Sequence, residues 1–210
     1  FHVTGVQTCA LPIYFMLNVA VIGAGLMGRN LARVAATAGA NVSMHDAFAG
    51  ALDASLKDLS QSGLKVRGSG DLAEAVRGAD FVIEAIIENV EAKQAIFERL
   101  SNVLPDAVLA SNTSVLPITQ IAAKATKPER VVGTHWWNPP QLIPVVEVVR
   151  AKHTSDATMD KTVEFLKALG KTPVRVERDV PGFVGNRLQH ALWREAIALI
   201  AGGRSEEHTS

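Results

Sequence analysis

The sequence has little cysteine, no excess of either charge and no long apolar run. Cys9 is its one cysteine, which excludes a disulfide framework and a thiolate metal site. Lys and Arg together number 21, as do Asp and Glu, so no net positive charge attracts nucleic acid or an anionic membrane. No apolar run approaches the ~20 residues that cross a bilayer. These absences predict a soluble, cytoplasmic protein that binds neither nucleic acid nor membrane.

The two ends of the sequence are predicted not to be native protein. Residues 204–210 read RSEEHTS, which the DNA string AGATCGGAAGAGCACACGTCT would encode. The reverse complement of that string, read in one frame, encodes TCALPI, which is residues 8–13. We therefore expect residues 1–13 and 204–210 to derive from a sequencing-library adapter, and such segments are set aside before fold reasoning. On this hypothesis Met16 is a candidate start, and the natural protein continues past Gly203.

The remaining sequence predicts an α/β fold. Its 48% hydrophobic content is enough for one substantial core, or for one domain and part of another. Short β-rich runs alternate with amphipathic stretches, which indicates a doubly wound, mostly parallel Rossmann sheet. The predicted strands are 19–22, 42–45, 81–85, 108–111, 131–134, 145–149 and 174–176. The predicted helices are 26–38, 49–62, 71–76, 89–104, 155–169 and 183–201.

A domain boundary is predicted at residues 179–182, which read DVPG. Pro181 fixes its own φ and biases Val180 toward extended geometry. The helix predicted after it carries an apolar stripe that no later element of the sequence covers. We therefore expect residues 14–180 to form the α/β domain and residues 181–203 to begin a second, all-helical domain.

A glycine-rich turn separates the first predicted strand from the first predicted helix. Gly23, Gly25 and Gly28 form a GxGxxG pattern whose variable positions include Leu26 and Met27. This context predicts a dinucleotide site. Gly23 permits the tight turn, Gly25 lets the backbone approach the pyrophosphate, and Gly28 allows close packing of helix and strand.

Asp46 ends the next strand, where its carboxylate can accept hydrogen bonds from ribose hydroxyls and would repel a 2′-phosphate. NAD is therefore favoured over NADP. Glu84 and Glu88 follow at the end of a later strand, where ligands bind in such sheets. Lys93 could reach a phosphate or pair with a glutamate. Either surface charge or a ligand site would explain these three residues.

Two further polar clusters follow predicted strands. Residues 111–114 read SNTS and end in Ser114, which favours a ligand role over simple loop capping. His135 begins the segment HWWNPP, and Glu147 follows twelve residues later. A histidine at a strand end can act as a general base toward a hydroxyl, and a buried glutamate can orient its ring. A core histidine beside two tryptophans is the alternative.

The sequence resembles the 3-hydroxyacyl-CoA dehydrogenase family. The resemblance covers about residues 18–200 and rests on several segments in family order: VIGAGLMG, VIEAIIENVEAK, SNTSVLPI, GTHWWNPP, VVEVV, LGKTPV and DVPGFVGNR. It implies an NAD-dependent oxidoreductase of fatty acid metabolism. It also implies that the second domain is helical, forms a homodimer and helps to close the cleft, so this chain alone should catalyse poorly.

The resemblance assigns roles to individual residues. His135 would take the proton of the substrate's 3-hydroxyl, Glu147 would pair with His135, and Ser114 and Asn186 would bind the reacting oxygen or position the histidine. The residues implied to bind NAD beside the glycine turn are Asp46, Glu88, Lys93 and Asn138.

Two departures from the family pattern affect the substrate. The tryptophan pair after His135 replaces a smaller pair such as FF. Only 37 residues separate Asp46 from Glu84, enough for a helix, a short strand and a short helix, whereas fatty-acid-oxidising members carry a long helical hairpin there that helps to hold CoA. A dehydrogenase of a small free 3-hydroxy acid, of the sugar-acid or carnitine type, is therefore an alternative. A non-catalytic, NAD-binding relative like the crystallins is a third.

Overall fold

A computed structural model of the chain describes residues 17–204. Residues 1–13 and nearly all of 204–210, the segments predicted to derive from an adapter, lie outside the described residues. Within this range, none of the helices is long and apolar enough to cross a membrane.

The core of the molecule is one eight-stranded sheet with the order β3-β2-β1-β4-β5-β6-β7-β8. Its strands are β1 (Asn18–Ile22), β2 (Asn41–His45), β3 (Val66–Ser69), β4 (Phe81–Glu84), β5 (Val108–Ser111), β6 (Val131–Trp136), β7 (Val145–Val149) and β8 (Thr172–Val176). Every neighbouring pair is parallel except β6 and β7, which are antiparallel. The predicted mostly parallel Rossmann sheet is confirmed.

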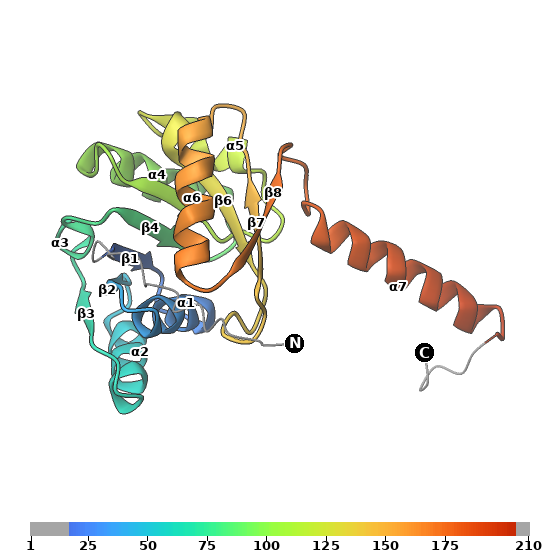
Figure 1. Cartoon of the computed structure of the whole chain (residues 1–210), viewed down its shortest axis with the longest axis horizontal. Helices are drawn as coiled ribbons and strands as arrows, with labels where there is room; N and C mark the ends of the chain where they lie inside the picture. Colours follow the sequence, from blue (N-terminus) through green and yellow to red (C-terminus); the bar gives the residue numbers. More distant parts are fainter. Residues whose placement is uncertain (1–16, 205–210) are drawn as a thin grey trace, which may run out of the picture.

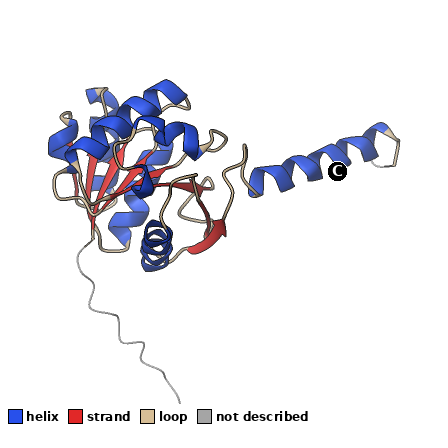
Figure 2. Ribbon diagram, turned by 90° about the horizontal axis from the view of Figure 1, so that it is seen from above, coloured by secondary structure: helices blue, strands red, loops and turns tan. Residues whose placement is uncertain are grey.

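Helices cover both faces of the sheet (Figure 2). One face packs on α1 (Leu26–Thr37), α2 (Ala49–Gln61) and α6 (Asp156–Ala168). The opposite face packs on α3 (Leu72–Val76), α4 (Val90–Val103) and α5 (Ile118–Ile121). Successive residues of β1 serve the two sides, since Val19 and Val21 belong to the first core and Ala20 and Ile22 to the second. This alternation explains why the central strands read as continuous apolar runs.

Several helices begin at side-chain caps that the sequence displays. Asp71, Asn89 and Ser155 each accept a hydrogen bond from the backbone N–H three residues later. Such caps satisfy one of the N–H groups that the first helical turn leaves without a partner. These caps place the starts of α3, α4 and α6 within a residue of the predicted positions.

The last helix, α7 (Gly185–Ala201), leaves the body of the molecule (Figure 1). None of its residues is buried, and Leu188, Leu192 and Ile197 expose 67%, 68% and 65% of their surface. The predicted start at Phe183 was wrong by two residues. Phe183 adopts a φ of 50° and is fully buried, so it ends the connection from β8 instead of entering the helix.

The structure adds elements for which the sequence analysis gave no position. These are β3, α5 and two 3-10 turns, 122–124 and 128–130. All are three or four residues long, too short for a periodic pattern to reveal. The segment between Asp46 and Glu84 contains α2, β3 and α3, which confirms the predicted helix, short strand and short helix.

Candidate active site

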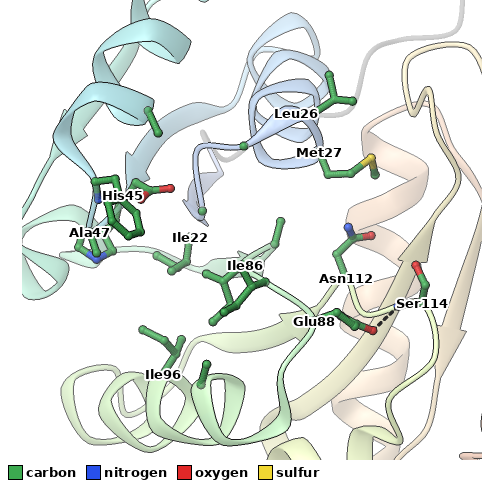
Figure 3. A pocket seen from close by; sticks show the side chains of 18 of the residues that line it. Ile22, Leu26, Met27, His45, Ala47, Ile86, Glu88, Ile96, Asn112 and Ser114 are labelled. Atoms are coloured by element: carbon green, nitrogen blue, oxygen red, sulfur yellow. Dashed lines mark hydrogen bonds between the residues drawn. The ribbon is translucent and has the colours of Figure 1, made fainter.

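A cleft of about 880 Å³ opens at the carboxyl ends of β1, β2 and β4 (Figure 3). Leu26 and Met27 at the start of α1 line one side of it, and Ile86 and Ile96 line the other. The cleft lies where the strand order reverses on either side of β1. Ligands bind at this point in doubly wound sheets.

The glycine turn shapes this cleft through close backbone contacts. Gly23 has a φ of 104° and donates its N–H to the His45 carbonyl at 2.8 Å. A Cβ on Gly28 would lie 1.8 Å from the Gly23 carbonyl oxygen, whereas a Cβ on Gly25 would meet no atom within 4 Å. Gly28 is therefore needed for packing, and Gly25 leaves open space where the cleft passes the start of α1.

Asp46 joins the end of β2 to the glycine turn. Its Oδ2 accepts the N–H of Ala24 at 2.7 Å, and its Oδ1 accepts the N–H of Phe48 at 2.8 Å. Asp46 also lines the cleft. The carboxylate is thus fixed by two backbone groups while it remains beside the space that a dinucleotide would occupy.

Three of the charged residues that the sequence analysis selected form one group, in which Glu84 and Lys93 are buried and Glu88 is partly exposed. Lys93 Nζ lies 2.6 Å from Glu84 Oε1 and 3.3 Å from Glu88 Oε2. Ser111 Oγ donates to the second oxygen of Glu84 at 2.6 Å. Lys93 exposes 1% of its surface and is not among the residues that line the cleft. It pairs with both glutamates, one of the two possibilities that the sequence left open.

Glu88 lies at the floor of the cleft and orders the loop after β5. Its Oε1 accepts the N–H of Ser114 at 3.1 Å, drawn in Figure 3, the N–H of Val115 at 3.3 Å and the hydroxyl of Thr113. Partial burial alone would raise the pKa of Glu88, but these hydrogen bonds and the charge of Lys93 outweigh it and lower the pKa. The carboxylate is therefore ionised at neutral pH.

A second, smaller cleft of about 220 Å³ adjoins the first. Met27, Asn112 and Ser114 line both. The remaining walls come from the end of β6 and the start of α7: His135, Trp136, Trp137, Asn138 and Asn186. The structure thus brings together the predicted residues Ser114, His135, Asn138 and Asn186, although they lie far apart in the sequence.

His135 and Glu147 are direct neighbours across the antiparallel β6–β7 pair. His135 Nδ1 lies 2.7 Å from Glu147 Oε2, and the two residues expose 5% and 3% of their surfaces. Since an ionised carboxylate only accepts hydrogen bonds, the proton of this contact belongs to Nδ1. The lone pair of the neutral ring is then on Nε2, away from Glu147.

The other oxygen of Glu147 binds the start of α7. Oε1 accepts the N–H groups of Val184 and Gly185, both at 2.9 Å. Burial would raise the pKa of Glu147, but the hydrogen bonds from His135, Gly185 and Val184 outweigh that effect and lower the pKa. Both oxygens of this buried carboxylate are satisfied, and it is ionised.

Aromatic rings and the first turn of α7 enclose the histidine. The Phe183 and Trp137 rings lie 5.5 Å and 6.0 Å from that of His135. A Cβ on Gly185 would come within 2.2 Å of the Trp137 ring, so only glycine lets α7 begin here. Asn186 Nδ2 donates to the Ser114 carbonyl at 2.9 Å, which links α7 to the loop after β5.

Asn112 is a candidate that the sequence analysis placed in a polar cluster without a role of its own. Its Oδ1 accepts the N–H of Trp136 at 3.1 Å, and it lines both clefts. The backbone groups of Val184 and Gly185 were also missed. A backbone N–H donor has no side-chain pattern in the sequence, so only the folded structure reveals these two groups.

The lowered pKa of Glu147 predicts how stability depends on pH. Because the folded-state pKa lies below the ordinary value of 4.5, ionised Glu147 stabilises the fold above that value, and the contribution is lost as the pH falls through the folded-state pKa. Urea unfolding between about pH 5 and about pH 3 should therefore show a flatter pH dependence in Glu147→Gln than in the unmodified chain. Glu98→Gln, at an exposed site on α4, is the control, and equal slopes in all three proteins would contradict the prediction.

Comparison with known proteins places the chain in a family. Residues 18–180 match the family described as 3-hydroxyacyl-CoA dehydrogenase, NAD binding domain. The chain is 37% identical over 202 residues to 5-formyl-3-hydroxy-2-methylpyridine 4-carboxylate 5-dehydrogenase of Mesorhizobium japonicum, covering 89% of this chain and 65% of that protein. It is 38% identical to a probable 3-hydroxybutyryl-CoA dehydrogenase of Bacillus subtilis, covering 89% and 71%.

A solved structure agrees. The crystal structure of a 5-formyl-3-hydroxy-2-methylpyridine 4-carboxylic acid 5-dehydrogenase, described as an NAD⁺-dependent dismutase, superimposes with a TM-score of 0.85 at 35% identity, covering 92% of this chain and 68% of that one. The match of residues 18–180 extends over most of the described chain. The protein belongs to the 3-hydroxyacyl-CoA dehydrogenase family of NAD-dependent oxidoreductases, and its Rossmann domain is the NAD-binding domain of that family.

Proposed function

We propose that the protein takes part in the NAD-dependent oxidation of the 3-hydroxyl of a 3-hydroxyacyl-CoA to the corresponding ketone. The observation that carries this proposal is the buried His135–Glu147 pair, held at 2.7 Å in a cleft that adjoins the dinucleotide cleft through Asn112 and Ser114. Removal of a hydroxyl proton during hydride transfer requires a general base next to the bound cofactor.

In this proposal the residues of the chain move and hold the proton. His135 accepts the proton of the substrate hydroxyl at Nε2, while its Nδ1–H stays hydrogen-bonded to Glu147. The ionised carboxylate fixes the ring and stabilises the imidazolium that forms. Ser114 and Asn186, which both line the smaller cleft, would bind the reacting oxygen or position His135, and the aromatic rings around His135 would limit the access of water.

The residues of the larger cleft fit NAD. NAD, when bound, supplies the acceptor for the substrate's hydride. The space at Gly25 and the free amides at the start of α1 suit a pyrophosphate, and Asp46 suits the ribose hydroxyls and disfavours a 2′-phosphate. Glu88, which lines this cleft, and Asn138, which lines the adjoining smaller one, would face the ribose and nicotinamide. Lys93, which is buried, would act by holding Glu84 and Glu88.

The walls beside His135 favour an uncharged reacting group. Within residues 17–204, the lining of the smaller cleft contains amides, a hydroxyl and aromatic rings but no lysine, arginine, aspartate or glutamate. A thioester carbonyl next to the 3-hydroxyl needs no cation, whereas a free carboxylate would. This supports a CoA thioester as the substrate class, and with it we propose a role in fatty acid metabolism, in the cytoplasm.

One observation favours the alternative of a small free 3-hydroxy acid. The segment between Asp46 and Glu84 contains only α2, β3 and α3, without the long hairpin that helps fatty-acid-oxidising members to hold CoA. A relative named for a pyridine carboxylate is also about as similar in sequence as one named for a CoA thioester. The neutral lining beside His135 weighs against this alternative within the described part of the chain.

Replacement of His135 tests the catalytic proposal. In the full-length protein, His135→Ala should lower kcat with 3-hydroxybutyryl-CoA roughly 100-fold or more and change the Kd for NAD by less than about twofold, because the imidazole would act on the hydroxyl proton alone. The measurements are NADH formation and calorimetric titration with NAD. His153→Ala, at an exposed site far from the cleft, is the control.

The same assay separates the substrate classes. Turnover of 3-hydroxybutyryl-CoA but not of free 3-hydroxybutyrate or carnitine supports the thioester, and the reverse result supports the free acid. An equal loss of NAD binding and turnover in His135→Ala would contradict the role as base. Binding of NAD without turnover of any of these compounds would support the crystallin-like alternative.

Two glycines of the turn should respond differently to alanine. Gly28→Ala should lower the melting temperature by several degrees, because its Cβ would lie 1.8 Å from the Gly23 oxygen. Gly25→Ala should leave the melting temperature unchanged but weaken NAD binding about tenfold or more, because its Cβ enters the space proposed for the pyrophosphate. Thermal unfolding and calorimetric titration measure both effects, and unchanged NAD binding in Gly25→Ala would contradict the proposed cofactor position.

We also propose that the apolar face of α7 packs in a helical dimerisation domain, so that the full-length protein is a homodimer. The exposed leucines of α7, Leu188 and Leu192, would lie in this interface. Leu188→Glu should weaken the dimer by at least tenfold in Kd, since it buries a charge without a partner. Light scattering of the full-length protein measures this, with Arg187→Glu as a control on the same helix. A monomer at all concentrations would contradict the proposal.

A further inference from the structure

The connection between β8 and α7 determines where α7 begins, and Asp179 holds its middle. Within residues 17–204, Asp179 makes the only hydrogen bonds that tie residues 178–182 to the rest of the domain. Arg178, Val180 and Pro181 are exposed. Glu177, which precedes this stretch, pairs with Arg150 at 2.6 Å, so Asp179 is the anchor between Glu177 and the buried Phe183.

Asp179 binds the backbone where the segment after β5 turns into α5. Its Oδ1 accepts the N–H of Ile118 at 2.9 Å, and its Oδ2 accepts the N–H of Thr119 at 2.6 Å. Hydrogen bonds from backbone N–H groups to a carboxylate are short and about twice as strong as those between neutral groups. Ile118 is itself fully buried in the core, so the anchor point is rigid.

The same connection delivers two groups to the catalytic pair. Val184 and Gly185, a few residues after Asp179, donate their N–H groups to Glu147 Oε1. Phe183, which lies between Asp179 and Val184 in the sequence, packs against the His135 ring. A shift of the connection would therefore move both the hydrogen bonds of Glu147 and the ring that covers His135. Among the residues that the structure describes, His135 on β6 is the one titratable side chain in contact with Glu147, and the donors at the start of α7 are backbone groups.

We propose that Asp179 is a positioning residue for the reaction: by clamping the connection to the start of α5, it holds the first turn of α7 against Glu147 and so fixes the His135–Glu147 pair. This inference rests on the proposed function, because it matters for turnover only if that pair is catalytic. Asp179 itself touches neither cleft.

Asp179→Asn tests the clamp with little change of shape. The amide can accept one of the two hydrogen bonds, and its NH₂ group opposes the other N–H donor. In the full-length protein we expect kcat to fall roughly tenfold with the Kd for NAD unchanged. In the 210-residue chain, the pKa of Glu147 should rise, because the N–H groups of Val184 and Gly185 no longer hold its carboxylate. The titration is followed by the carboxyl ¹³C resonance of labelled glutamate, assigned with Glu147→Gln.

The control is Asp156→Asn, which removes another carboxylate that pairs at the surface, with Arg150 at 2.8 Å. It should leave kcat and the pKa of Glu147 as they are. A purely structural role for Asp179 would lower the melting temperature without moving that pKa, and this result would overturn the proposal. An unchanged kcat in Asp179→Asn would overturn it as well.

Hydrogen exchange in the unmodified chain gives a test that needs no variant to fold. The amides of Ile118, Thr119, Val184 and Gly185 should exchange with one common opening free energy, below that of global unfolding, because the clamp opens as a unit. Independent exchange of the two pairs would overturn the proposal. If the two pairs of amides exchange together but His135→Ala retains turnover, the clamp stands and the proposed function fails. If His135→Ala loses turnover but the two pairs exchange separately, the proposed function stands and the clamp fails.

Discussion

Glu147 is a buried carboxylate, and the way its charge is satisfied links the parts of the molecule. One oxygen holds the ring of His135 and the other holds the two N–H groups at the start of α7. A buried ion without partners would take up a proton or destabilise the fold. The antiparallel β6–β7 pairing, the glycine at the start of α7 and the connection from β8 are all needed to satisfy it.

Lys93 is a second buried charge, and its partners fix residues beside the dinucleotide cleft in the same way. Lys93 lies between Glu84 and Glu88, and Glu88 in turn fixes the loop that carries Ser114. Buried ion pairs seldom add net stability, but loss of one partner is costly. The arrangement therefore fixes the shape of the loop that separates the two clefts. Asn112 and Ser114, which line both clefts, derive their positions from it.

The assignment to the family and the proposal for the substrate depend on different parts of the molecule. The glycine turn, Asp46 and all eight strands of the sheet lie within residues 18–180, which match the family's NAD-binding domain. The proposed substrate side is the smaller cleft at the end of β6 and the start of α7, where the tryptophan pair and the neutral amides lie. The relative named for a CoA thioester and the one named for a pyridine carboxylate are about equally similar to this chain, which is consistent with a common cofactor domain serving different substrates.

The sequence by itself determined the strand and helix order and the dinucleotide fingerprint, because periodicity, caps and glycine spacing are local properties of the chain. Placement at strand ends indicated Ser114, His135 and Glu147 as candidates, and the family resemblance added Asn186. The sequence did not reveal the position of β3, the existence of α5, the true start of α7 or the burial of Lys93. Those depend on contacts between segments far apart in sequence. Only the tertiary structure decided that His135 and Glu147 face each other across one antiparallel pair, and that backbone amides of α7 complete the site. A backbone donor has no side-chain signature, and its direction is fixed only when the chain around it has folded.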